Sequence, residues 1–122
     1  MESFTLRKSF QISTGDDTPT TLGTLDFSDS RWIYVRVEIC AEGKATVQAF
    51  TEWRTIYECK NGTLSKSGVE QKIVTGTPGT SSTAMILSGN TLTIQVTGVA
   101  AENVVWCAFI QGQEQIPTQF AQ

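Results

Sequence analysis

The stretch Arg31-Trp32-Ile33-Tyr34-Val35-Arg36-Val37-Glu38-Ile39-Cys40-Ala41 decides the fold class of this chain. From position 33 onward every odd-numbered residue is apolar, while charged and amphipathic residues occupy most even-numbered positions. Successive side chains of a β-strand point to opposite faces of the sheet, so this strict alternation predicts a half-buried strand. The following residues, Glu42-Gly43-Lys44, predict a turn.

The rest of the chain repeats this pattern of strands and turns. Further strands are predicted at Phe4–Ile12, Leu22–Phe27, Val47–Glu58, Val69–Val74, Ala84–Leu87, Leu92–Thr97 and Val104–Ile110. Asn61-Gly62 and Gly89-Asn90 predict tight turns, because these residue types tolerate a positive φ. Seven to eight strands at short spacing, with no helical periodicity, predict an all-β antiparallel β-sandwich, of which the jelly roll is one form.

Two segments depart from simple alternation. Aromatic residues occupy both parities of Phe50–Tyr57, which predicts a β-bulge, a strand that passes from one sheet to another, or an interface with another chain. Val104–Ile110 is apolar on both faces, which predicts a central position in the sheet or cover from a neighbouring subunit. We therefore expect the domain to be complete only inside an oligomer.

The chain of 122 residues has the size of one domain. We assign residues 1–112 to a single β-sandwich domain, in which residues 1–29 show the weaker strand pattern. Residues 113–122 are rich in Gln and lack periodicity, so they predict a flexible tail that is able to dock onto a partner.

Composition argues against several classes of partner. The net charge is −3 and the nine basic residues are scattered, so no stripe of charge exists to follow a phosphate backbone. No apolar stretch reaches the ~18 residues that a membrane span needs. The start of the chain lacks the charged-then-apolar order of a secretion signal. We therefore expect no nucleic acid or membrane partner, and assembly in a cytoplasm.

Catalytic chemistry has little support in the sequence. Histidine is absent, which removes the commonest general base and zinc ligand. Glu38, Glu52 and Glu58 are the candidates for a glycosidase carboxylate pair. Beside Arg36 and Arg54, these glutamates also fit a cross-strand ladder of ion pairs. The ladder is the interpretation that we favour, and we expect no enzyme.

Metal and cofactor sites are not indicated either. Asp16-Asp17 and the pair Asp26, Asp29 lack the spacing of calcium-binding loops, so we interpret them as solvated turn residues. Cys40, Cys59 and Cys107 contain no CxxC motif. They fit either small apolar core positions or, because their number is odd, thiols that cross-link neighbouring subunits.

Aromatic residues mark the candidate contact surface. Trp32, Tyr34, Trp53 and Tyr57 lie in long predicted strands, where they suit an interface or a sugar-stacking platform. We expect Trp106 to lie in the core.

The last third of the chain resembles a known kind of module. Gly89–Gly98, which ends in Val96-Thr97-Gly98, and the Trp-centred run Val104–Ile110 are similar to the closing strands of small β-sandwich modules in virion proteins of tailed bacteriophages. The resemblance covers roughly residues 30–112. It implies a structural or attachment role and a tendency to form homotrimers, and it carries over no catalytic residue.

These observations lead to a hypothesis about function. We expect a virion structural protein, a capsid decoration protein that binds as a homotrimer to the major capsid protein or to a tail protein. The chain has no long fibrous N-terminal region, which disfavours a tail fibre. The alternatives are a receptor- or glycan-binding knob that uses Trp32, Tyr34 and Trp53, and a glycoside hydrolase.

Overall fold

The fold consists of strands alone. The computed structural model describes residues 5–114 and contains nine antiparallel strands and no helix within them. The strands are β1 (Thr5–Thr14), β2 (Pro19–Asp26), β3 (Ser30–Gly43), β4 (Gln48–Lys60), β5 (Thr63–Lys66), β6 (Gln71–Thr77), β7 (Ser82–Ser88), β8 (Thr91–Thr97) and β9 (Val104–Glu114). The predicted all-β class is confirmed. The additional strand is β5, which directly follows the Asn61-Gly62 turn.

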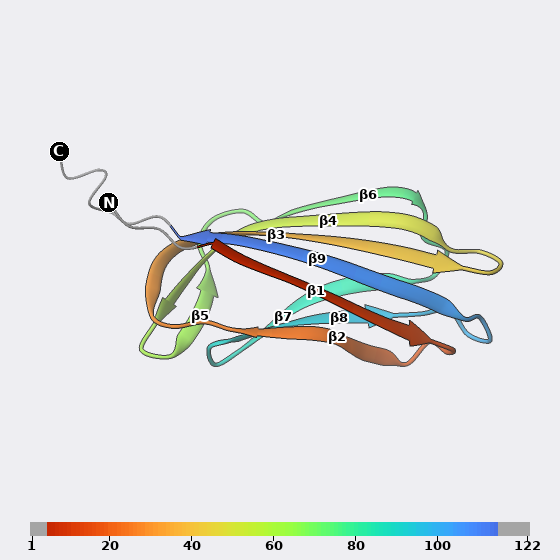
Figure 1. The fold of residues 1–122 in the computed structure, drawn as a ribbon, viewed down its shortest axis with the longest axis horizontal. Helices are drawn as coiled ribbons and strands as arrows, with labels where there is room; N and C mark the ends of the chain where they lie inside the picture. Colours follow the sequence, from red (N-terminus) through yellow and green to blue (C-terminus); the bar gives the residue numbers. More distant parts are fainter. Residues whose placement is uncertain (1–4, 115–122) are drawn as a thin grey trace.

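The strands form two layers (Figure 1). The larger sheet has the order β1-β9-β3-β4, and the far edge of β4 pairs with β6 along its first part and with β5 along its last part. The smaller sheet has the order β2-β8-β7. The first strand, β1, pairs with the last, β9, and the second strand, β2, pairs with β8, as in a jelly roll. In a jelly roll the next two strands would lie in different sheets, whereas β3 and β4 form a hairpin within the larger sheet.

The core lies between the two sheets and follows the predicted alternation. Its main contributors are Ile33, Val35, Val37 and Ile39 of β3, Leu92, Ile94 and Val96 of β8, and Val104, Trp106, Ala108 and Ile110 of β9. Trp106 is 1% exposed, as expected of a core residue. Its indole Nε1 donates a hydrogen bond of 3.0 Å to Thr14 Oγ1, so its one polar atom is satisfied inside the core.

β4 keeps one alternation from end to end. Its register with β3 is unbroken over residues 48–57, so the prediction of a bulge or a change of sheet is wrong. The sequence suggests that the buried side of β4 changes from odd-numbered to even-numbered positions. It does so because polar Thr51 and Thr55 are buried, whereas apolar Phe50 and Ile56 are exposed on the other face. The third alternative, an interface with another chain, stays a prediction.

β9 is central, between β1 and β3. That position is one of the two explanations offered for its apolar character. The strand continues to Glu114, beyond the predicted end of the domain at residue 112. The remainder of the predicted tail, from residue 115 onward, lies outside the described residues.

A buried carboxylate organises the turn between β3 and β4. Glu102 is 7% exposed, and its oxygens accept hydrogen bonds from the backbone amides of Ala45 (3.1 Å), Thr46 (2.9 Å) and Val47 (3.3 Å). The Thr46 hydroxyl donates a fourth bond of 2.7 Å. Led by that hydroxyl, these bonds lower the pKa of Glu102, because they favour the charged form.

The lowered pKa predicts acid sensitivity. A depressed carboxyl pKa contributes stability above the pKa of the unfolded chain, and that contribution is lost as the pH falls through the folded value. We expect Glu102→Gln to lower the free energy of unfolding at pH 7, and the difference from wild type to shrink well below pH 4.5, the ordinary value for this group. Urea unfolding at pH 7 and at acid pH measures both effects. The exposed Glu42→Gln is the control, and an equal pH response in the two variants would contradict the prediction.

Gly23 allows the two sheets to meet at β1 and β2. A Cβ at this position would lie 2.5 Å from the ring of Phe10, much closer than a van der Waals contact. The register of β2 on β8 also shifts between Thr21 and Gly23. The close approach of the Phe10 ring therefore requires glycine here.

Substitution of Gly23 tests this contact. We expect Gly23→Ala to lower the free energy of unfolding by about 1–3 kcal/mol, the usual cost of overpacking a core. Gly15→Ala is a matched control because its Cβ would meet only Asn103 Oδ1, at 3.3 Å. The control should stay within about 0.5 kcal/mol of wild type. Equal losses in urea unfolding would show that the Phe10 contact is unimportant.

Candidate functional site

The candidate site is the face of the larger sheet that points away from the smaller sheet. The odd-numbered residues of β3 are buried, so its even-numbered side chains point to this side. The strand registers then identify their neighbours on the other strands. We define the outer face as Arg7, Ser9, Gln11 and Ser13 of β1; Val105, Cys107, Phe109, Gln111 and Gln113 of β9; Tyr34, Arg36, Glu38, Cys40 and Glu42 of β3; Gln48, Phe50, Glu52, Arg54 and Ile56 of β4; and Gln71, Ile73, Thr75 and Thr77 of β6.

Among the described residues, six of the ten large exposed apolar side chains lie on the outer face. Its large exposed apolar side chains are Tyr34, Phe50, Ile56, Ile73, Val105 and Phe109, with exposed fractions from 36% to 55%. The opposite surface of the protein, formed by the smaller sheet, is rich in threonine and serine. Its outward positions are Pro19, Thr21, Thr24, Asp26, Thr91, Thr93, Gln95, Thr97, Ser82, Ala84, Ile86 and Ser88. The outer face therefore carries more large exposed apolar side chains than the smaller sheet, which makes it the better candidate for an interaction surface.

Two charged rows cross the middle of the outer face. Arg36 lies directly opposite Arg54, and Glu38 lies directly opposite Glu52; we call these pairs the arginine row and the glutamate row. Like charges placed opposite each other on neighbouring strands repel.

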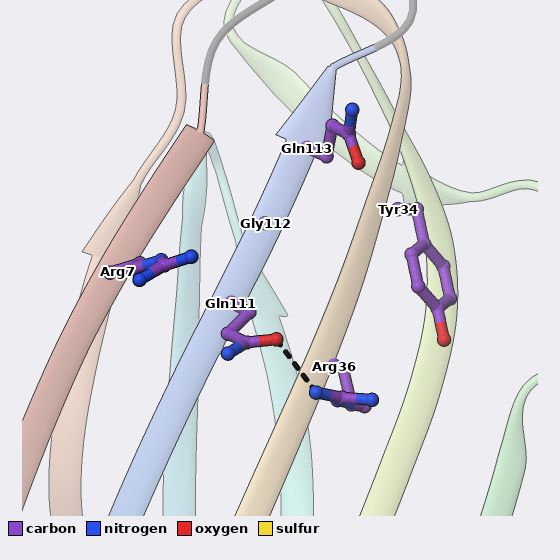
Figure 2. A pocket seen from close by; sticks show the side chains of 6 residues that line it. All are labelled: Arg7, Tyr34, Arg36, Gln111, Gly112 and Gln113. Carbon is purple, nitrogen blue, oxygen red and sulfur yellow. Dashed lines mark hydrogen bonds between the residues drawn. The ribbon is translucent and has the colours of Figure 1, made fainter.

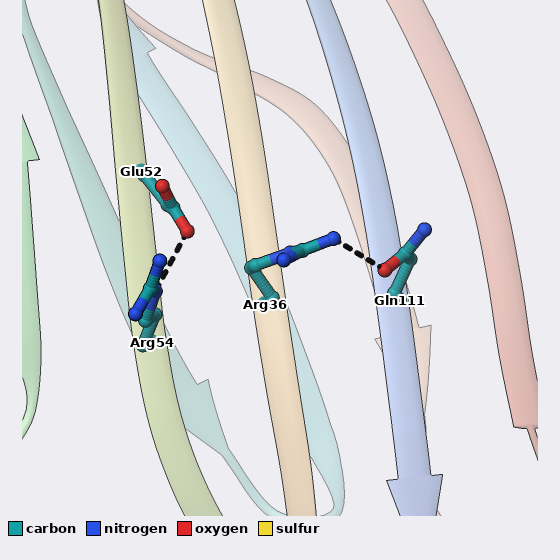
Figure 3. Close-up of polar contacts among 4 residues, drawn as sticks. All are labelled: Arg36, Glu52, Arg54 and Gln111. Atoms are coloured by element: carbon teal, nitrogen blue, oxygen red, sulfur yellow. Dashed lines mark hydrogen bonds and ion pairs between the residues drawn. The ribbon is translucent and has the colours of Figure 1, made fainter.

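The side chains of Arg36 and Arg54 point away from each other (Figure 3). Arg54 Nε turns to Glu52 Oε2 at 2.7 Å, and the hydrogen bond and charge of Glu52 raise the pKa of the Arg54 guanidinium. Arg36 extends the other way, toward β9, and its Nη2 donates to Gln111 Oε1 at 2.7 Å. Within the described residues no carboxylate pairs with Arg36, and its Nε is buried without a hydrogen-bond partner.

A shallow pocket of about 240 Å³ lies beside Arg36 (Figure 2). It is lined by Arg7, Tyr34, Arg36, Gln111, Gly112 and Gln113. Arg7 points from β1 toward β9, so two guanidinium groups flank Gln111. Guanidinium groups bind carboxylates and other anions in a forked geometry. Sequence reasoning missed Arg7, Gln111 and Gln113, because only the pairing of β1 with β9 and of β9 with β3 brings them to Arg36.

The four aromatic residues predicted to form a contact surface do not share one surface. Tyr34 lies on the outer face, and Trp32 is 41% exposed at the start of β3, where the register with β4 is irregular. Trp53 points to the inner side, where its Nε1 donates to Thr83 Oγ1 at 2.9 Å. Tyr57 is 1% exposed, and burial raises its pKa to about 12. Of the four, only Tyr34 is therefore shown to lie on the outer face.

The three cysteines occupy two different environments. Cys40 and Cys107 face each other across β3 and β9 on the outer face, half-buried and reduced. Burial, and then the nearby Cys107, raise the pKa of the Cys40 thiol. Cys59 is buried, with its Sγ 3.9 Å from the carbonyl oxygen of Phe27. Among the described residues, no group of three or more His, Cys, Asp or Glu side chains is placed to hold a metal ion.

The structure brings only some of the predicted acidic residues together. Glu38 and Glu52 are cross-strand neighbours, whereas Glu58 lies further along β4 and contacts Lys60 at 3.3 Å. The predicted cross-strand ladder of ion pairs is wrong, because the charges directly opposite each other on β3 and β4 have the same sign. Arg54 pairs instead with Glu52, two residues away on its own strand.

The aspartates stabilise loops and strand ends. The carboxylate of Asp29 accepts the amides of Asn61 and Gly62, each at 3.0 Å. These bonds, the one from Gly62 most, lower the pKa of Asp29. Asp26 accepts from the Thr91 hydroxyl at 2.6 Å, and Asp16 accepts the Thr18 amide at 3.0 Å.

Comparisons of the chain with protein-family models, with curated proteins and with solved structures give no match. No helix in the described part of the chain is long and apolar enough to span a membrane. The surface itself therefore carries the functional argument.

The facing thiols lead to a prediction about oxidation. Residues opposite each other in antiparallel strands have Cα atoms about 4.5–5.5 Å apart, within the range of about 4.4–6.8 Å for disulfides. We expect glutathione disulfide to oxidise Cys40 and Cys107 to an intrachain disulfide, with two molecules of glutathione released. Peptide mapping by mass spectrometry under non-reducing conditions identifies the bond.

Two variants control this experiment. Cys59→Ser should leave the disulfide unchanged, because Cys59 is distant from the pair and buried. Cys40→Ser should abolish it. Covalent dimers as the main product of the wild type would contradict the prediction and would favour cross-linked subunits instead.

Proposed function

We propose that this chain is a structural protein of a bacteriophage virion, a capsid decoration protein that binds other proteins through the outer face of its larger sheet. The observation that carries the proposal is the apolar character of that face, with Phe109 55% exposed and Ile73 48% exposed. Burial of such side chains against a partner removes apolar area from water, which is favourable by about 25 cal/mol per Å² before the entropic cost of association is subtracted.

The composition of the outer face supports protein contact. Aromatic residues and arginine are enriched in protein interfaces, and both are present here in Tyr34, Phe50, Phe109 and the arginine row. The charged rows lie between apolar positions, which suits a contact that needs a fixed orientation.

The resemblance to virion modules supplies the biological setting. It implies self-association, in the form of a homotrimer, and a partner in the particle, either the major capsid protein or a tail protein. The particle would assemble in the host cytoplasm. Immunogold electron microscopy of particles, with an antibody against the purified chain, tests this proposal. Label over the head shell supports decoration, label at the tail tip favours the second candidate function, and unlabelled particles would refute both.

The second candidate function is a receptor- or glycan-binding knob. The pocket beside Tyr34 favours it, because guanidinium and amide side chains suit the hydroxyl and carboxylate groups of sugars. A glycan array tests this candidate: binding that is lost in Tyr34→Ala supports it, and a silent array with the assembled protein counts against it.

A substitution on each surface tests which one makes the particle contact. We expect Phe109→Ser to weaken binding to particles that lack the protein by at least about tenfold, because central aromatic residues dominate interfaces. Ile86→Ser is the matched control: Ile86 is 39% exposed, on the smaller sheet, and its loss should have little effect. Co-sedimentation with the particles measures both. A larger effect from Ile86→Ser would move the contact to the opposite surface.

A further inference from the structure

The outer face has an ordered pattern along β3 and β4. Its four consecutive cross-strand pairs are Cys40–Phe50, Glu38–Glu52, Arg36–Arg54 and Tyr34–Ile56. In order along the strands, the pairs are apolar, negative, positive and apolar. The pattern is therefore symmetric about the line between the glutamate row and the arginine row, except that the charge changes sign across that line.

A two-fold axis on that line makes the β3 and β4 part of the face complementary to itself, while on β9 and β6 it places Phe109 over Gln111 and Ile73 over Gln71. If the axis lies in the plane of contact and runs perpendicular to the strands, rotation keeps each strand in place and reverses the positions along it. The glutamate row of one copy then lies over the arginine row of the other. The apolar pair Cys40–Phe50 lies over the apolar pair Tyr34–Ile56. Such an isologous contact closes as a dimer.

The contact also satisfies what the single chain leaves unsatisfied. Inside one chain each charged row places like charges opposite each other, which is unfavourable. Arg36 is held only by the neutral amide of Gln111. A second copy would place the carboxylate of its Glu38 over Arg36, and a charge-assisted pair is stronger than a bond to a neutral amide.

The area that the axis superposes is that of a small interface. It pairs four outward positions on each of β9, β3 and β4 and two on each of β1 and β6. At about 4.8 Å between strands and about 6.7 Å between outward positions, these cover roughly 500 Å² on each copy, which is the size of a weak protein–protein contact rather than a standard one.

We infer that a second copy of this chain packs on the outer face through a two-fold axis between the glutamate row and the arginine row. This inference rests on the proposed assembly function and names a second copy as one occupant of the outer face. Because the particle would use the same face, the dimer of the free protein competes with particle binding. The self-contact has a two-fold form, in contrast to the trimer that the resemblance implies.

Two charge-reversed variants of the full chain test the inference. Variant A carries Arg36→Glu with Arg54→Glu, and variant B carries Glu38→Arg with Glu52→Arg. Each copy of variant A then presents glutamate in both rows, and each copy of variant B presents arginine in both. We expect sedimentation velocity to show a wild-type dimer, and the dimer Kd to rise by about 100-fold or more in each variant alone.

Mixing the variants is the decisive step. Because all four contacts between A and B join opposite charges, an equimolar mixture should form a heterodimer with a Kd close to that of the wild type. A contact that does not superpose the two rows predicts no such recovery. The charge control is Lys8→Glu with Lys44→Glu, which changes the net charge as variant A does at exposed positions off the outer face, and its Kd should be unchanged.

Folding of the variants is checked by thermal unfolding. If A or B fails to fold, the fourfold variant, in which the rows are exchanged and the charge is preserved, replaces them and should form a homodimer like the wild type. A wild-type monomer at all concentrations, a trimer, or a mixture of A and B that stays monomeric would overturn the inference.

The outcome is separable from the proposed function. A monomeric wild type that still binds particles would refute the two-fold contact and leave the decoration function intact. A dimer that shows the recovery but binds no particle would support the contact and contradict the decoration function.

Discussion

The register of β3 against β4 and β9 is the constraint on which the rest of the structure depends. Over residues 33–42 each position of β3 has a fixed neighbour on both sides. A slip of one residue would turn Ile33, Val35 and Val37 outward and would bury Arg36. The same register therefore sets both the core and the outer face, so a shift of β3 would change both at once.

Much of the fold could be predicted because its signals are local. The alternation in β3 and the Gly89-Asn90 turn lie within single short segments, and both appear in the structure. The misjudged segment, β4, shows the limit of this approach. Threonine is compatible with either face of a strand, so Thr51 and Thr55 did not indicate which face of β4 is buried. The outward Phe50 and Ile56 therefore suggested a bulge, which the structure does not have at these residues. Glu102 carries no local signal, because its partners lie 55 to 57 residues away in the chain.

The candidate site was harder to predict for the same physical reason. The residue types were visible in the sequence, but their meaning depends on pairs that join distant strands. Cys40 meets Cys107, and Arg36 meets Gln111, only because β9 returns to lie beside β3. The strand registers separate the residues that were predicted to form a contact surface. Tyr34 of β3 is exposed on the outer face, whereas Tyr57 of β4 is buried in the core.

The outer face conflicts with what the isolated chain would favour. Sequences that fold well tend to satisfy local and global preferences together, and violations concentrate at functional sites. Two rows of opposed like charges, a buried guanidinium nitrogen without a partner, and exposed aromatic side chains all occur on one face. The threonine-rich face of the smaller sheet has no comparable conflict. In the two-fold contact that we infer, the Glu38 carboxylate of a second copy lies over Arg36, so the contact would relieve the repulsion inside the charged rows.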